Sequence, residues 1–131
     1  MNEILSIRPV IIIVDDDEMT REVFSHIFST AEYVVDIRSN GDDLLHLTPP
    51  YPALILLDNH LPGMNGLDIC RTLKANCSTA HIPVIIISGS PAIGWRSLEV
   101  AADGCIEKPF NIHVLKELVR QLINENQHVT H

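Results

Sequence analysis

The sequence predicts an α/β protein with a doubly wound, five-stranded parallel sheet. Short runs of apolar, mostly β-branched residues recur along the chain, and segments with helical spacing of apolar residues separate them. Continuous apolar runs of this length are typical of strands that are buried on both faces. Because strand and helix alternate five times, we expect right-handed crossovers and helices on both faces of the sheet.

Five strands are expected from these runs. Three of them are apolar almost throughout, at 10–14, 53–57 and 82–87. The segment 33–38 mixes apolar and charged residues, which indicates a strand nearer an edge of the sheet. A short fifth strand is expected at 104–107.

Five helices are expected between and after the strands. Apolar residues recur at helical spacing in three segments. These positions are Met19, Val23, Phe24, Ile27 and Phe28, then Leu67, Cys70 and Leu73, and finally Val114, Leu115, Leu118 and Leu122. Shorter helices are expected at 42–47 and at about 92–102. Clusters of proline and glycine separate several of these elements, where turns are required.

Length and charge limit the number of domains and the class of partner. With 131 residues, 46% of them hydrophobic, the chain is long enough for one folded domain. We expect this domain over residues 9–124, with an N-terminal extension over 1–8 and a C-terminal tail over 125–131. The formal net charge of −8 argues against direct nucleic-acid binding, which requires basic residues that neutralise phosphates.

The sequence shows no sign of export or of a cysteine or histidine metal site. No apolar stretch reaches the ~20 residues of a membrane-spanning helix, and residues 1–8 do not read as a secretory signal. We therefore expect a cytoplasmic protein without membrane contact. The three cysteines lack C-x-x-C spacing and the seven histidines lack H-E-x-x-H spacing, so we expect neither a disulfide framework nor zinc.

Charged and polar residues directly follow four of the five expected strands. In an open parallel sheet, ligands bind beyond the carboxyl ends of the strands. The residues at these ends are Asp15, Asp16 and Asp17 after the first strand, Asp58 after the third, Ser88 after the fourth and Lys108 after the fifth. If these strands are neighbours, carboxylates, a hydroxyl and an ammonium group converge on one pocket.

This set of groups suits a divalent cation and phosphoryl transfer. Carboxylates ~4 Å apart repel each other by about 4 kcal/mol at an effective dielectric of ~20, and a bound cation removes this penalty. Because the expected ligands are all oxygens, Mg²⁺, or else Mn²⁺, is expected rather than zinc. A shielded carboxylate can then attack phosphorus to give an aspartyl phosphate, while Lys108 and Ser88 stabilise charge on the phosphoryl oxygens.

Each of these residues also has a purely structural interpretation. An Asp that follows a strand often caps the next helix, which is the role that we expect for Asp17. Asp58 alone could equally be a cap, the step at 108–110 could be a plain turn, and the hydroxyls of 88–90 could bond to their own backbone. We favour a functional site because four strand ends carry groups that suit one chemistry.

Four short motifs follow one another along the chain. They are Ile-Ile-Val-Asp-Asp-Asp at 12–17, Leu-Asp-Asn-His-Leu-Pro-Gly-Met-Asn-Gly at 57–66, Ile-Ser-Gly at 87–89 and Glu-Lys-Pro-Phe at 107–110. In this order and spacing they resemble the receiver domains of bacterial response regulators, and the resemblance covers residues 9–124.

The resemblance implies a flavodoxin-like fold, as in the chemotaxis regulators, with strand order 2-1-3-4-5. It implies a two-component phosphorelay in which Asp58 takes a phosphoryl group from a sensor histidine kinase or a histidine phosphotransfer protein. Such a domain is not an enzyme with a separate substrate. It catalyses only its own phosphorylation and dephosphorylation, and it signals by conformational change.

The resemblance also implies roles for individual residues. Mg²⁺ would be held by Asp16, Asp58 and the backbone carbonyl of His60, with Asp15 acting mainly through water. The residues that would contact the phosphoryl group are Ser88 and Lys108, and the bond between Lys108 and Pro109 would be cis.

Two features of the sequence depart from the family pattern. The family usually places a Tyr or Phe three residues before the Lys, and Cys105 stands there instead. The segment between Ser88 and Lys108 is also shorter than usual. We therefore expect an altered readout through the face formed by the fourth helix, the fifth strand and the fifth helix, with Ile93 and Trp95 as contacts of a downstream effector.

Two other functions remain open from the sequence. A haloacid-dehalogenase-like phosphatase would also use the Asp-x-Asp at 15–17, but it would leave Asp58 without a role and would need a cap domain. A receiver fold that docks without phosphorylation would be consistent with Cys105, but it would retain an unpaired acidic cluster at a cost in stability. Turnover of a phosphomonoester would identify the phosphatase, since a receiver forms a stoichiometric acyl phosphate.

Overall fold

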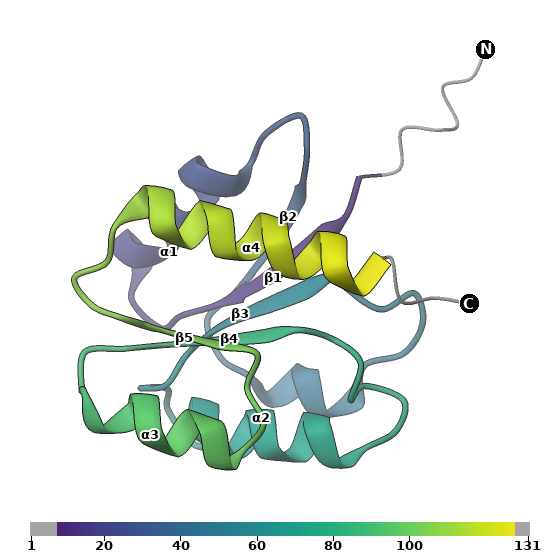
Figure 1. Ribbon diagram of the computed structural model, residues 1–131, viewed down its shortest axis with the longest axis vertical. Coiled ribbons are helices and arrows are strands. Elements are labelled where there is room, and N and C mark those ends of the chain that lie inside the picture. Colours follow the sequence, from purple (N-terminus) through teal and green to yellow (C-terminus); the bar gives the residue numbers. More distant parts are fainter. Residues whose placement is uncertain (1–7, 128–131) are drawn as a thin grey trace.

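Parallel strands form one sheet in the order β2-β1-β3-β4-β5, as predicted (Figure 1). The computed structural model describes residues 8–127. The strands are β1 (Val10–Val14), β2 (Val34–Arg38), β3 (Leu54–Asp58), β4 (Val84–Ser88) and β5 (Gly104–Glu107). The helices are α1 (Glu18–Phe28), the 3-10 helix η2 (Asp42–His46), α2 (Gly66–Ala75), α3 (Ala92–Glu99) and α4 (Ile112–Gln127).

The register of the sheet brings the functional strand ends to one edge. Val14 at the end of β1 is paired with Leu57, which places Asp58 one residue further along β3. Asp58 is paired in turn with Ile87, and Ser88 with Glu107. Asp58 and Ser88 are thus the last residues of their strands rather than the first residues of the loops.

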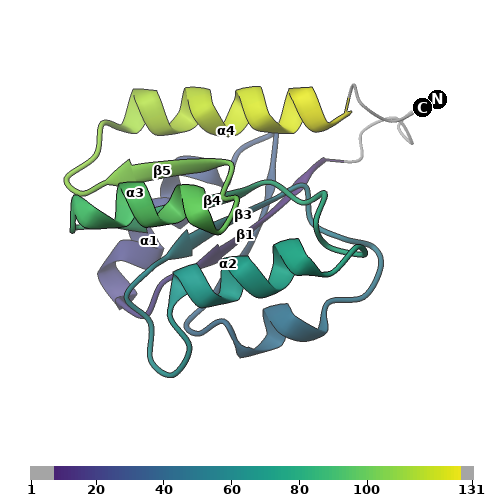
Figure 2. The same cartoon turned by 60° about the horizontal axis from the view of Figure 1, so that its bottom comes forward.

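Helices cover both faces of the sheet and enclose two apolar cores. The helices α1 and α4 pack on one face, while η2, α2 and α3 pack on the other (Figure 2). Buried residues of the first core include Phe24, Phe28, Leu115 and Val119, and those of the second include Leu44, Leu67, Ile69, Leu73 and Ile82. Full burial of one such side chain contributes about 1.5–3 kcal/mol.

The prediction of five helices is wrong within residues 8–127, where four α-helices are present and the expected helix at 42–47 is the short 3-10 helix η2. At η2 the cap residue Gly41 makes no side-chain bond, and only Leu44 is buried. The chain then reaches Pro49 and Pro50, and proline disfavours the helical conformation of the residue before it. Because residues at both ends limit this helix and one apolar residue anchors it to the core, it remains a short 3-10 helix of about one and a half turns.

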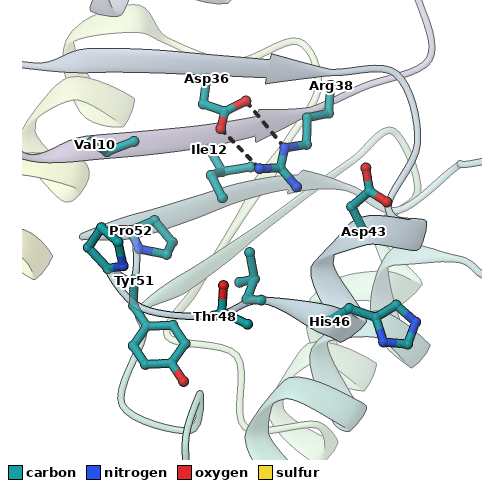
Figure 3. Close-up of a pocket in the computed structure, with 11 residues that line it drawn as sticks. Val10, Ile12, Asp36, Arg38, Asp43, His46, Thr48, Tyr51 and Pro52 are labelled. Carbon is teal, nitrogen blue, oxygen red and sulfur yellow. Dashed lines mark hydrogen bonds and ion pairs between the residues drawn. The ribbon is translucent and has the colours of Figure 1, made fainter.

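A cavity of about 440 Å³ lies beside this short helix (Figure 3). Asp36 and Arg38 on the edge strand β2 point into it and form an ion pair of 3.0 Å. Because η2 leaves this part of the sheet uncovered, the polar face of β2 meets open space instead of a helix.

The helix α3 is shorter than expected and ends at Glu99 rather than near 102. Ala101 has a left-handed backbone, with φ of 62°, which stops an α-helix. The side chains of Ile93 and Ser97 are buried, whereas Trp95 is 78% exposed. The expectation that Ile93 contacts an effector is therefore wrong, since Ile93 packs into the core; Trp95 remains available.

The ends of the chain extend beyond what the structure describes. Most of the expected extension at 1–8 and the last part of the expected tail at 125–131 lie outside residues 8–127. The helix α4 continues to Gln127, past the domain end expected at 124. Within the described residues, no helix combines the length and apolar character needed to cross a bilayer.

Candidate phosphoryl-transfer site

Three carboxylates lie together at the carboxyl ends of β1 and β3. Asp15, Asp16 and Asp58 each offer an oxygen atom, and these atoms lie within 4.8 Å of one another. Asp15 is 1% exposed and Asp58 is 5% exposed, whereas Asp16 is exposed to solvent. The structure thus brings together the carboxylates that the sequence placed at these strand ends.

Lys108 supplies the cation of this cluster. Its backbone N–H donates to the carbonyl of Ser88 at 2.8 Å, which joins the end of β5 to the end of β4. Its Nζ lies 3.2 Å from Asp58 Oδ1 and 3.7 Å from Asp15 Oδ2. The bond between Lys108 and Pro109 is cis, as predicted.

The positive charge of Lys108 does not neutralise the negative charge of the three carboxylates. Burial raises the pKa of Asp58 above its ordinary value and the charge of Asp15 raises it further, although Lys108 acts in the opposite direction. The pKa of Asp15 is also raised by burial, against the opposing effects of the Asp17 N–H and Lys108. Ionised carboxylates in this site therefore lack compensating charge.

The cluster has the properties of a divalent cation site. All its donor atoms are carboxylate oxygens, which Mg²⁺ and Mn²⁺ prefer. The oxygen Oδ2 of Asp15 is buried and has no hydrogen-bond partner among the described residues. A buried polar atom without a partner is costly, and a cation or its water ligands would satisfy it.

Ser88 is at the expected strand end, but its hydroxyl bonds to its own loop. It is 7% exposed, and its Oγ accepts a hydrogen bond of 3.0 Å from the N–H of Ser90. This is the local bond considered as a structural alternative above. A serine hydroxyl that accepts one bond still has its own hydrogen to donate, so the group can still serve a phosphoryl oxygen.

The loop after Asp58 closes back onto the strand end. Asn59 accepts bonds from the N–H of Gly66 at its carbonyl and of Leu67 at its side chain, each 3.0 Å long. A Cβ atom at Gly66 would lie 2.6 Å from the carbonyl oxygen of Asp58, so this position requires glycine. His60 lies in this loop with its side chain exposed, and its role as a carbonyl ligand stays a prediction.

Asp17 is a helix cap, as predicted. Its carboxylate accepts bonds from the N–H and the hydroxyl of Thr20, at 2.9 and 2.7 Å. These bonds lower the pKa of Asp17, with the hydroxyl of Thr20 as the largest cause. Asp17 therefore stabilises the start of α1 and is not one of the three clustered carboxylates.

The chain matches the response regulator receiver domain family over residues 11–120, and it belongs to this family. It is therefore a signalling domain of two-component systems, and the haloacid-dehalogenase-like alternative does not apply. The sheet order and the matched range agree with the resemblance inferred from the four motifs.

Individual relatives show the same architecture. The receiver domain of a signal transduction histidine kinase from Syntrophus aciditrophicus is 33% identical, with a TM-score of 0.81 over 89% of this chain and 91% of that one. A CheY-like receiver domain protein from Methanospirillum hungatei is 28% identical, with a TM-score of 0.82 over 95% of this chain and 100% of that one.

The curated relatives are longer than this chain. The phosphate regulon transcriptional regulatory protein PhoB of Rhizobium meliloti is 29% identical over 118 residues, which cover 88% of this chain and 52% of that protein. The chain thus spans about half the length of this relative.

Proposed function

We propose that Asp58 accepts a phosphoryl group from a phosphohistidine of a sensor histidine kinase or a histidine phosphotransfer protein, in a Mg²⁺-dependent reaction in the cytoplasm. The observation that carries this proposal is the buried Asp58 carboxylate, 3.2 Å from Lys108 Nζ and clustered with Asp15 and Asp16. In the transfer, a carboxylate oxygen of Asp58 forms the new O–P bond as the N–P bond of the donor breaks. The electron pair of that bond stays on the imidazole nitrogen.

The other two carboxylates of the cluster are less suited to be the acceptor. Oδ1 of Asp15 is already bonded to the N–H of Asp17 at 2.9 Å, and Lys108 lies closer to Asp58 than to Asp15. Asp16 has no such cation contact among those that the structure describes. Within residues 8–127, Asp58 alone of the three carboxylates has an ammonium group within hydrogen-bond distance, where charge on the phosphoryl oxygens would develop.

The residues that would hold Mg²⁺, or Mn²⁺ in its place, are Asp16, Asp58 and the backbone carbonyl of His60, with Asp15 acting through water. When bound, the cation supplies positive charge that offsets the repulsion among the carboxylates and neutralises phosphoryl oxygens. Lys108 would pair with one phosphoryl oxygen, and the free O–H of Ser88 would donate to another.

The phosphoryl donor would dock on an apolar surface beside Lys108. Met19, Val23, Phe110 and Ile112 border a cavity of about 400 Å³ that also touches Lys108, and we call these four residues the apolar collar. Met19 is 76% exposed, and Val23 and Ile112 are also exposed. A group of exposed apolar residues beside polar side chains is typical of a protein interface.

The output would pass through the face formed by α3, β5 and α4. Trp95 and Leu98 on α3 are both largely exposed and available to an effector. Cys105 on β5 is half-buried and packs against the core under α3, so it offers no aromatic ring that could change its rotamer. We therefore propose that a shift of α3 and its backbone carries the signal.

Mass measurement tests the acceptor. The protein is incubated with Mg²⁺ and acetyl phosphate, and the intact protein is weighed beside Asp58→Asn and the surface control Asp68→Asn. We expect one added phosphoryl group on the wild type and on Asp68→Asn, and none on Asp58→Asn. Labelling of Asp58→Asn would move the acceptor elsewhere, and an unlabelled wild type would favour docking without phosphorylation.

A further inference from the structure

A second cation lies behind the acidic cluster, on α1. Arg21 is half-buried, and its Nη1 donates a hydrogen bond of 2.9 Å to the main-chain oxygen of Asp15. The N–H of Arg21 donates to the carbonyl of the cap residue Asp17 at 3.0 Å. Because Asp17 fixes the start of α1, the side chain of Arg21 is held against the peptide that joins Asp15 to Asp16.

Together with two other hydrogen bonds, this bond fixes the N–H, the carbonyl and one carboxylate oxygen of Asp15. The N–H of Asp15 donates to the carbonyl of Arg38 on β2 at 3.1 Å, and its Oδ1 accepts from the N–H of Asp17 at 2.9 Å. With its N–H, its carbonyl and one carboxylate oxygen engaged, Asp15 is left with Oδ2 for the cluster. That oxygen is buried, and it has no hydrogen-bond partner among the described residues; Lys108 Nζ lies 3.7 Å away.

We propose that Arg21 is a positioning residue for cation binding. Its bond to the Asp15 carbonyl orients the peptide between the two acidic residues, and so holds both carboxylates where a divalent ion is bound. The inference rests on the proposed function only in taking Asp15 and Asp16 as members of a cation site. Loss of a partner that orients metal ligands typically weakens metal binding 10–100-fold.

The charge of Arg21 lowers the affinity of the site for a divalent cation, whereas its hydrogen bond raises this affinity. A guanidinium group near the site repels a second cation, so its removal would tighten cation binding if charge were its only contribution. Removal of a positioning bond would weaken cation binding instead. The sign of the change in affinity therefore separates the two roles.

The test measures Mn²⁺ affinity without any phosphorylation. Free Mn²⁺ is followed by electron paramagnetic resonance during titration of the wild type, Arg21→Met and Arg21→Gln. Arg21→Met removes the charge and every side-chain donor, whereas Arg21→Gln removes the charge and leaves an amide donor on a shorter side chain. Both residues favour a helix. Arg71→Met is the matched control, because Arg71 pairs with Asp68 on the exposed surface of α2. Thermal unfolding of each variant reports any general loss of structure.

We expect Arg21→Met and Arg21→Gln to bind Mn²⁺ about tenfold more weakly than the wild type, and Arg71→Met to bind as the wild type does. Arg21→Lys, which keeps the charge and an ammonium group that can donate to the Asp15 carbonyl, should recover part of the loss. If one uncharged variant fails to fold, the other decides. Equal or tighter binding by a folded uncharged variant would overturn the positioning role. A wild type that binds no Mn²⁺ would refute the metal site itself and the positioning role with it.

Discussion

At the scale of single residues, Asp58 combines burial with uncompensated charge. Its pKa is raised above the ordinary 3.8, chiefly by burial and then by Asp15. A carboxyl group with a raised folded pKa lowers stability as the pH rises from 3.8 through that folded pKa. At neutral pH the full cost is present, and below pH 3.8 it is absent. The group that carries the proposed chemistry thus destabilises the metal-free protein.

Asp58→Asn should therefore stabilise the metal-free protein. The change removes the buried charge and keeps the shape, so we expect the free energy of unfolding at pH 7 to rise on the order of 1 kcal/mol. The gain should shrink as the pH falls toward 4. Urea unfolding with a chelator present measures it, with Asp68→Asn, a half-buried carboxylate on α2, as control. A gain that is independent of pH would contradict this explanation.

Gly66 is required by the close approach of the loop to the strand end. We expect Gly66→Ala to cost about 1–3 kcal/mol, because the new Cβ would meet backbone that cannot move away without shifting Asp58. The control is Gly89→Ala, where an added Cβ meets no atom within 4 Å. Urea unfolding of both variants measures the difference, and equal stability would show that the loop relaxes freely.

At the scale of elements, the strands were predictable and the ends of helices were not. A short, fully apolar and β-branched run such as 10–14 is stable mainly as a buried strand, so its place in the sheet follows from the sequence. The form of η2 and the end of α3 depend instead on local backbone preferences. These come from the two prolines that follow η2 and from Ala101, which has a left-handed backbone after α3.

The same distinction applies to the site. The strand ends that carry Asp15, Asp58, Ser88 and Lys108 were predicted, because strand order places them at one edge. The bond of Arg21 to a main-chain oxygen was not predicted, since it depends on how α1 lies against the sheet. The backbone bond from Arg21 to Asp17 is one that any residue four positions after an N-cap makes, so it gives no signal of the side-chain bond.

The helix α3 has an internal glycine that it does not need for packing. An added Cβ at Gly94 meets no atom within 4 Å, so Gly94→Ala should stabilise the protein by roughly 0.5–1 kcal/mol through the lower backbone entropy of the unfolded chain. Urea unfolding measures this. A loss of stability would show that position 94 lies against another group.

At the scale of the whole molecule, two surfaces divide the proposed functions. The apolar collar lies beside Lys108, while Trp95 and Leu98 lie on α3, which packs on the opposite face of the sheet from α1. A donor that contacts Met19 and Val23 on α1 and an effector that contacts Trp95 and Leu98 on α3 would therefore approach from opposite faces of the sheet. A change of one of these two residue pairs should leave the function of the other pair intact.

The collar can be tested separately from the chemistry. Met19→Gln keeps the length of the side chain and removes its apolar end, so phosphotransfer from a phosphorylated histidine phosphotransfer protein should slow by about tenfold. Labelling by acetyl phosphate should not change, since it needs no docking. Trp95→Ala is the control and should transfer at the wild-type rate. Slower labelling by both donors would place the effect in the site instead.

Chemical trapping identifies whether Asp58 itself carries the phosphoryl group. Borohydride reduces an aspartyl phosphate to homoserine and leaves a free carboxylate unchanged, so peptide mass spectrometry after labelling identifies the acceptor residue. We predict homoserine at position 58 alone, formed only when Mg²⁺ and acetyl phosphate are both present. Homoserine at position 15 or 16, or none in a fully folded wild-type protein, would contradict the account.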